Sequence, residues 1–202
     1  MTDPLLTGKP GRIDLVEVPP MIYLAIEGQG APEGAAYAVA VQALYTLAYG
    51  ARFAGKAQGI DEKVGPLEGL WWADDMAAFV GGQREVWRWR MMIRAPGWLA
   101  AAGLEDLRAA ALRKKAKEPD LVAALGRVAL VPLDEGTCLQ ALHLGSYADE
   151  APLIARMHEQ EMPARGLAPT GFHHEIYLSD PRKVAPEKLK TILRQPVTVK
   201  ED

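Results

Sequence analysis

Apolar residues in the first part of the chain follow two different spacings in turn. Residues 21–26 form an apolar run typical of a buried strand, and residues 35–49 carry apolar side chains at helical spacing. A second strand is predicted at residues 64–72, and a polar turn near Gly81-Gly82 precedes residues 85–94, where unlike residues alternate. The predicted order is therefore strand, helix, strand, strand.

The same order of elements returns in the second part of the chain. The residues between the two parts, 96–126, carry a leucine and alanine stripe and are predicted to form a connecting surface helix. Its basic cluster at residues 113–117 is typical of a solvated helix end, because cations are favourable at helix C-termini. After it we predict a strand, a turn, a helix and two strands, at residues 137–144, 145–147, 149–162, 172–179 and 191–199.

This doubling predicts an α+β fold of two β-α-β-β modules within one domain that spans residues 1–202. The modules are expected at about residues 13–95 and 127–202. A β-α-β-β unit forms an antiparallel sheet with helices on one side, so two units leave their other faces to approach each other. We expect a ligand cleft at that pseudo-two-fold junction. The residues that correspond in the two modules are Gly28 with Gly145 and Glu68 with Glu175.

The composition is that of an ordinary globular protein: 49% of the 202 residues are hydrophobic and the formal net charge is -3. Without an overall basic field, nucleic acid is not an expected partner. The single cysteine, Cys138, excludes an intramolecular disulfide and a multi-cysteine metal site, and its apolar surroundings predict burial. The sequence shows no secretory signal and no run long enough for a membrane helix, so we expect a cytoplasmic protein with no membrane partner.

The candidate chemistry is concentrated in residues 172–179. Strand alternation places His173, Glu175 and Tyr177 on one face and His174 with apolar neighbours on the other. One face can pack on helices while the other holds ionisable and aromatic groups. Burial of Glu175 there would raise its pKa and let it exchange protons nearer neutrality. The alternative is a sheet half exposed to water, with Glu175 merely solvated.

Four of the five tryptophans lie in two short predicted strands. Trp71 and Trp72 are neighbours that point to opposite faces, so at least one belongs to the core. One or two of the four, which include Trp87 and Trp89, are expected to line a ligand cavity. Aromatic rings beside a carboxylate favour lipophilic cationic or flat aromatic ligands. The four histidines lack metal-ligand spacing and no phosphate-loop, nucleophile-elbow or dinucleotide motif occurs, so neither a metal nor a cofactor is expected.

Five motifs together resemble the GyrI-like small-molecule-binding family. They are residues 66–72 (PLEGLWW), 87–93 (WRWRMMI), 143–147 (HLGSY), 173–181 (HHEIYLSDP) and 186–191 (PEKLKT). The resemblance covers nearly the whole chain, and the fourth motif is the most distinctive. It implies a duplicated β-α-β-β module of the SHS2 type that frames a ligand cleft, with Glu175 as the glutamate that meets cationic ligands.

The chain resembles the stand-alone members that hydrolyse cyclopropane-bearing alkylating natural products. The first predicted strand begins near Ile13, which leaves no room for the DNA-binding domain that precedes this module in some relatives. The resemblance implies a detoxifying activity in which water opens the strained ring, with Glu175 and Tyr147 positioning or activating that water. Ser146 stands where the family often has proline, a departure that bears on the position of Tyr147. The ligand-binding residues that it implies are Trp71, Trp72, Trp87, Trp89, Phe172, His173, Tyr177 and Glu68.

Two other functions stay open on the sequence. One is a binding protein that sequesters drugs without catalysis. The other is an inhibitory partner of a macromolecule such as a topoisomerase. Product formation from a cyclopropane compound separates the enzyme from both.

Overall fold

The chain divides into two compact units in the computed structural model, which describes residues 3–73 and 84–200. One unit, residues 21–133, is continuous in sequence. The other is built from residues 1–20 and 134–202. We call them the continuous unit and the discontinuous unit.

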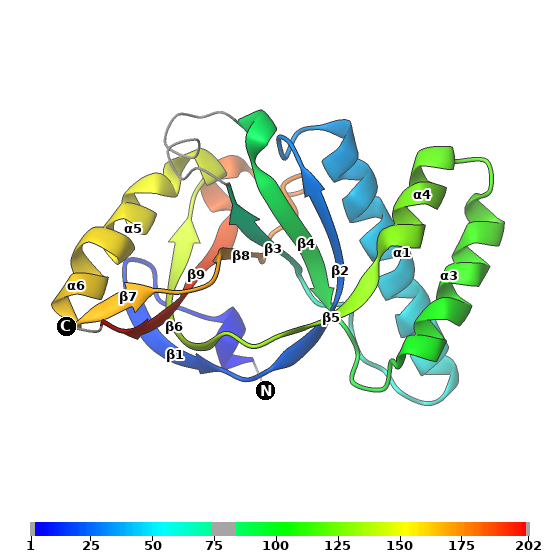
Figure 1. Cartoon of the computed structure of the whole chain (residues 1–202), viewed down its shortest axis with the longest axis horizontal. Helices are drawn as coiled ribbons and strands as arrows, with labels where there is room; N and C mark the ends of the chain where they lie inside the picture. The colour runs from blue at the N-terminus through cyan, green and yellow to red at the C-terminus, as the bar shows by residue number, and fades with distance from the viewer. Residues whose placement is uncertain (1–2, 74–83, 201–202) are drawn as a thin grey trace. The chain divides into compact units, whose positions relative to one another are not determined.

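The continuous unit has the strand, helix, strand, strand order that the sequence predicts. Its elements are β2 (Met21–Gln29), α1 (Ala35–Ala57), β3 (Leu67–Trp72), η2 (Arg84–Val86), β4 (Arg88–Arg94), α3 (Ala101–Lys115), α4 (Pro119–Arg127) and β5 (Ala129–Leu133). The strands are antiparallel in the order β3-β4-β2-β5 (Figure 1). The turn expected near Gly81-Gly82 lies outside the described residues.

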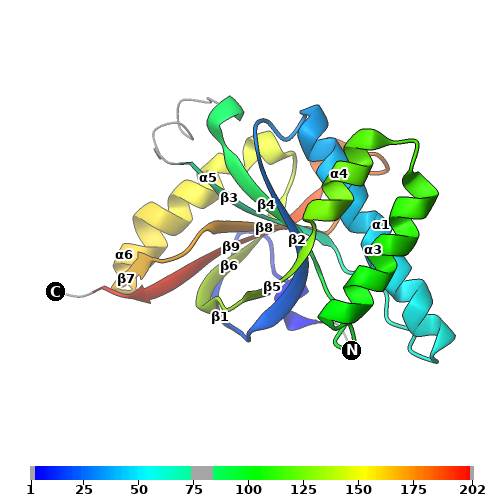
Figure 2. The same ribbon diagram turned by 45° about the vertical axis from the view of Figure 1, so that its right-hand side comes forward.

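Helix α1 packs its apolar stripe against the sheet of the continuous unit. The helix ends at Ala57 with Gln58 as its C-cap, and Gly59 takes the left-handed conformation, with φ 80°, that commonly terminates helices. Helices α3 and α4 pack on α1 and form an outer layer (Figures 1 and 2). The buried residues of α1 recur at the spacing of one helical face: Ala40, Ala43, Leu44, Leu47, Ala48, Ala51 and Gly55.

The connection expected as one helix over residues 96–126 is two helices. α3 ends at Lys115 and Pro119 lies in the first turn of α4, where its missing N–H would have had no acceptor. The guanidinium of Arg108 on α3 donates to three carbonyls at the end of α4, at 2.7, 2.8 and 3.0 Å. The chain then adds β5 to the same sheet, so the continuous unit extends to residue 133 rather than ending before the connection.

The discontinuous unit repeats the order and adds two strands. Its elements are η1 (Pro4–Leu6), β1 (Ile13–Val18), β6 (Gly136–Leu144), η3 (Tyr147–Asp149), α5 (Ala151–Arg156), the π-helical η4 (Met157–Glu161), α6 (Met162–Ala164), β7 (Leu167–Pro169), β8 (His173–Tyr177), η5 (Pro186–Lys188) and β9 (Lys190–Val199). The repeat consists of β6, the helical segment after it, β8 and β9, and the added strands are β1 and β7. In its antiparallel sheet β6, β9 and β8 hold the places of β2, β4 and β3. β1 pairs with β6, and β7 pairs with the end of β9.

One face of the sheet in the discontinuous unit packs against the helical segment from α5 to α6. Met157 and Met162 of this segment form an apolar cluster with Ile13, Leu139 and Leu193 of the strands. All five are buried, and each such side chain stabilises the fold by about 1.5–3 kcal/mol relative to leaving it exposed. The cluster fixes which sheet face the helical segment covers.

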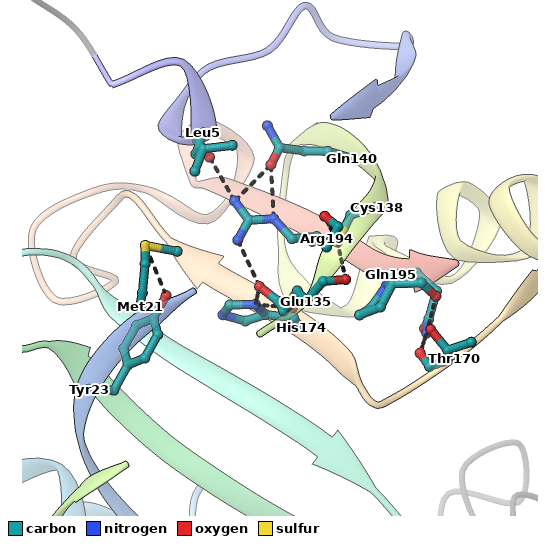
Figure 3. A network of polar contacts seen from close by, with 12 residues as sticks. Leu5, Met21, Tyr23, Glu135, Cys138, Gln140, Thr170, His174, Arg194 and Gln195 are labelled. Carbon is teal, nitrogen blue, oxygen red and sulfur yellow. Dashed lines mark hydrogen bonds and ion pairs between the residues drawn. The ribbon is translucent and has the colours of Figure 1, made fainter. Parts of the chain in front are cut away.

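The opposite face of that sheet holds a buried polar network around Arg194 (Figure 3). Its guanidinium donates to Gln140 Oε1 at 2.8 and 3.0 Å, to Glu135 Oε2 at 3.2 Å, and to the Leu5 carbonyl at 3.0 Å. His174 Nδ1 lies 2.9 Å from Glu135 Oε1. Burial raises the pKa of Glu135, but His174 and Arg194 outweigh it, so the pKa is lowered overall. The network therefore holds an ionised carboxylate in the interior.

Cys138 is buried, as the sequence predicts. Its Sγ lies 3.7 Å from the Glu135 carbonyl oxygen. Burial, together with the Glu135 carboxylate, raises the pKa of this thiol to about 12. Because the thiolate is the reactive form, Cys138 is chemically inert in the folded chain.

Candidate functional site

The segment singled out from the sequence forms strand β8, and its predicted alternation is confirmed. His174 and Ile176 are fully buried, whereas His173, Glu175 and Tyr177 are partly exposed. Successive side chains of a strand point to opposite faces, which accounts for the two classes. β8 thus presents an acid, an imidazole and a phenol side by side.

The face that carries Glu175 is the helix-covered face, which corrects the interpretation that helices and ionisable groups take opposite faces. Glu175 pairs across the sheet with Leu193, which packs against Met157 and Met162. Directly paired residues of antiparallel strands share a face. Ionisable groups therefore occupy both faces of this sheet: Glu175 on one, and the network around Arg194 on the other.

Glu175 is held by two neighbours on its own strand. The Tyr177 hydroxyl donates to Glu175 Oε2 at 2.8 Å, and His173 Nε2 lies 3.6 Å from Oε1. The Glu175 side chain keeps 16% of its surface exposed. A carboxylate has about four acceptor positions, so Glu175 is oriented by these contacts and can still accept a hydrogen bond from a bound molecule.

Tyr147 joins this group from η3, directly after β6. Its ring lies 5.6 Å from the Tyr177 ring, edge to face, and the residue is 41% exposed. Burial of its hydroxyl, followed by the charges of Glu150, Glu175 and Asp180, raises the pKa of Tyr147 to about 12. Tyr147 therefore stays protonated at neutral pH beside Glu175.

Ser146 is built into the turn before Tyr147. The Ser146 hydroxyl donates to Asp149 Oδ2 at 2.7 Å, and its carbonyl lies 3.0 Å from His143 Nε2. Gly145 has φ 140°, a backbone conformation that residues other than glycine rarely adopt. The turn is thus held without proline, and Tyr147 still reaches Tyr177.

Glu150 is a member of this site that the sequence analysis missed. It immediately precedes α5 and is only 4% exposed. Burial and the neighbouring charge of Glu175 raise the pKa of Glu150 to about 9, and the Thr191 hydroxyl offsets part of the rise. The only sequence signal is its position before Ala151-Pro152, where proline marks a helix start. That signal fixes a helix boundary and says nothing of burial.

Several buried polar atoms around these carboxyls have no hydrogen-bond partner within the described part of the chain. They are Glu150 Oε1 and both ring nitrogens of His173. His158, in the π-helical segment, is also close, since burial and then His173 lower its pKa. Buried polar groups without a protein partner are costly, so atoms of this kind are suited to bind a polar molecule or water.

The tryptophans singled out from the sequence gather in the continuous unit. The Trp71 ring lies 6.1 Å from Tyr37, stacked, and 6.0 Å from Trp87, edge to face. The Trp89 ring lies 5.5 Å from Tyr37, and its indole nitrogen donates to the Gly30 carbonyl at 3.2 Å. Trp71 and Trp89 are buried, so at least these two belong to the core, as expected for part of the set.

The remaining predicted ligand-binding residues differ in their exposure. Trp72 and Glu68 lie on β3 on the face opposite Trp71, with Trp72 partly exposed and Glu68 buried. Phe172, directly before β8, is 40% exposed. Trp87 is partly exposed, with Arg84 5.7 Å above its ring. A ligand-binding role for Glu68 and the tryptophans stays a prediction.

The described residues hold no group of three or more potential metal ligands, and no described helix is long and apolar enough to cross a membrane. What the discontinuous unit does offer is an acid–base set: two carboxyls, an imidazole and two phenols on one sheet face. Such a set can hold a cationic or polar ligand and can move protons at a bound molecule.

Comparison with known proteins relates the whole chain to one family. The family model for a GyrI-like small molecule binding domain matches residues 12–198. An uncharacterized conserved protein from Listeria innocua is 38% identical, with a TM-score of 0.82, over 94% of this chain and 93% of that chain. A hydrolase from Listeria innocua is 39% identical, with a TM-score of 0.79 and the same coverage. The C-terminal domain of EcmrR, 11% identical with a TM-score of 0.58 over 93% and 97% of the chains, shares the fold. Among curated proteins none matches.

Proposed function

Because the chain belongs to the family of GyrI-like small molecule binding domains, we propose that it binds lipophilic small molecules and hydrolyses a cyclopropane-bearing alkylating compound, which would detoxify it. The observation that carries the proposal is the acid and aromatic group of the discontinuous unit: Glu175 oriented by Tyr177, with Tyr147 against the same ring. Relatives 37% and 39% identical are described as hydrolases, which supports a catalytic rather than a purely binding role.

The reaction adds one water molecule across a ring bond of a cyclopropane that is conjugated to a carbonyl. The water oxygen bonds to a ring carbon, the carbon–carbon bond breaks, and its electron pair moves to the carbonyl oxygen. One proton leaves the water and one proton is taken up by that oxygen. The site must therefore supply a base for the water and an acid for the oxygen.

The residues on β8 and η3 match these two tasks. Glu175 is an oriented carboxylate that can accept the water proton. Tyr147 can donate a proton, because the phenol is protonated at neutral pH and its exposed surface is open to a ligand. The rings of Tyr147 and Tyr177 offer apolar and cation-attracting surface to a flat or cationic ligand.

The test is product formation in isotopically labelled water. The protein is incubated with a carbonyl-conjugated cyclopropane compound in H₂¹⁸O, and mass spectrometry is used to look for one labelled oxygen in the product. Glu175→Gln should slow the reaction about 100-fold or more while leaving the fold intact. The matched control is Glu187→Gln, an exposed glutamate of η5, which should keep the wild-type rate.

A protein that binds the compound without labelled product would be a sequestering protein, the function that the family description favours next. Full activity in Glu175→Gln would remove Glu175 from the reaction. Tight association with a protein target, in the absence of any small-molecule binding, would contradict both functions.

A further inference from the structure

Glu150 has no place in the reaction described so far, although it is the most deeply buried carboxyl near Glu175. Its side chain is 4% exposed, and its Oε1 atom has no hydrogen-bond partner within the described residues. An ionised carboxylate in that position would lack the pairing that buried charges need. The neutral, protonated form avoids this cost.

The groups that face Glu150 come from three elements. β8 contributes Glu175, with His173 and Tyr177 beside it, η3 contributes the Tyr147 phenol, and β9 contributes the Thr191 hydroxyl. Farther out, Asp180 acts on Tyr147, and His158 is close to His173. The nearest charge is thus the Glu175 carboxylate, and no lysine or arginine ion pair to Glu150 occurs among residues 3–73 and 84–200.

Glu175 has the opposite surroundings. It accepts a hydrogen bond from Tyr177 at 2.8 Å, has His173 at 3.6 Å, and keeps contact with solvent. Two close carboxyls cannot both ionise cheaply, so the one with better support takes the charge and the other keeps the proton. Of the two carboxyls, Glu150 is the one whose surroundings favour keeping the proton.

We propose that Glu150 and Glu175 form one proton-sharing pair at neutral pH, in which Glu150 is a positioning residue that restores the proton donated by Tyr147. This inference rests on the hydrolytic function proposed above. Glu150 is only 4% exposed, whereas Tyr147 is 41% exposed and is affected by the charges of both carboxyls.

The proton balance closes over one reaction cycle. Glu175 takes a proton from the attacking water, and Tyr147 gives its proton to the oxygen that receives the electron pair. Glu150 then reprotonates Tyr147, which leaves the pair with its proton on Glu175. Transfer of that proton from Glu175 to Glu150 regenerates the starting state, with no other reactant needed.

The protonation state is tested without any substrate, by infrared difference spectroscopy between the wild type and Glu150→Gln. At pH 7 the wild type should show the carbonyl stretch of one protonated carboxyl, which Glu150→Gln lacks. In Glu175→Gln the same band should disappear at a lower pH than in the wild type, because the charge that opposes ionisation has been removed. The proton-sharing pair would be overturned if the wild type showed no such carbonyl band at pH 7. It would also be overturned if the pH midpoint of the band were the same in Glu175→Gln as in the wild type.

The catalytic part is tested by the pH dependence of kcat. The wild-type rate should fall on the alkaline side as the pair loses its proton, near pH 9. Glu150→Gln should lower kcat about 10- to 100-fold and remove that alkaline limb, with partial recovery in Glu150→Asp. If Glu150→Gln unfolds, it loses its near-ultraviolet circular dichroism signal. The proposal is then tested by the carbonyl band of the wild type and by the shift of that band in Glu175→Gln.

The outcomes separate the two proposals. A protonated carboxyl at pH 7 with no hydrolysis by the wild type would keep the pair and overturn the hydrolytic function. Hydrolysis by the wild type with unchanged kcat and pH profile in Glu150→Gln would keep the function and overturn the role of Glu150.

Discussion

In the continuous unit, the helix-covered face of the sheet is filled by rings. Trp71 and Trp89 are buried there against Tyr37 of α1. In the discontinuous unit, strands in the same order and a helix in the same place cover Glu175, Glu150 and two phenols instead. One arrangement of backbone therefore supports a face used for packing in one copy and a face of ionisable groups in the other.

The difference extends to the two glutamates that correspond in the sequence. Glu68 of β3 lies on the face opposite Trp71, whereas Glu175 of β8 lies on the helix-covered face with Leu193. They occupy equivalent strands but opposite faces. Two residues that correspond in sequence order can therefore lie on opposite sheet faces, because side chains alternate along each strand. Such residues need not share the same chemistry.

The largest expected effect concerns the other face of the discontinuous unit. Arg194→Met should lower the free energy of unfolding by about 3–5 kcal/mol, because it leaves the buried Glu135 carboxylate with less compensation. The matched change in the continuous unit is Arg90→Met, whose pair with Glu27 is exposed and is worth about 0–1 kcal/mol. Urea denaturation measures both, and equal losses would mean that burial of the network does not matter.

Trp89→Ala tests whether the rings of the continuous unit are core. Trp89 is 1% exposed, so the loss of its ring should cost about 3–5 kcal/mol of unfolding free energy. Trp72→Ala, on the partly exposed face of β3, is the control and should cost less than half as much. A small loss for Trp89→Ala in urea denaturation would contradict a packing role.

Gly28→Ala tests how closely the Trp89 ring is packed. An added Cβ would lie 2.2 Å from Cη2 of that ring, so we expect a cost of about 1–3 kcal/mol from overpacking. Gly126→Ala, in α4, has open space around the new carbon and should stabilise the protein by up to about 1 kcal/mol. Thermal unfolding of the two variants should shift in opposite directions, and a shared direction would refute this account.

A pH-dependent change concerns Glu150 and follows from its pKa, which is raised from 4.5 to about 9. Below pH 4.5 the carboxyl is protonated in the folded and unfolded chains, so it adds no pH dependence. Between pH 4.5 and about 9 only the unfolded chain loses this proton, so rising pH favours unfolding. Glu150→Gln removes that penalty and should stabilise the protein more at pH 8 than at pH 5, by up to about 1.4 kcal/mol for each pH unit between them.

Denaturation at both pH values measures the effect, with exposed Glu187→Gln as the control. A stability difference between wild type and Glu150→Gln that does not change with pH would show that Glu150 is ionised in the folded protein. It would also remove the contrast between a ring-filled face and a face that stores a proton.

The sequence predicted the parts of the fold that depend on local pattern. The alternation along β8 placed His173, Glu175 and Tyr177 together, and the periodicity after residue 35 placed α1. It missed the break before α4, although Pro119 signals a helix start. Helical periodicity on both sides of the break hid that signal.

The sequence could not predict contacts that only the tertiary structure creates. Glu135, His174 and Arg194 are far apart along the chain and meet because β8 and β9 pair beside the start of β6. Glu150 follows another acid in a polar turn, where solvation is the ordinary expectation. Its burial depends on how α5 meets the sheet, which no local pattern records.

Strand β1 has a consequence for the order in which the protein is made. Ile13 pairs with Ala141, so the hydrogen-bonding partner of β1 is synthesised only after the whole continuous unit. The continuous unit can close its own sheet during translation. Strand β1 therefore lacks its partner until β6 is made, and an unpaired strand edge can pair with other chains.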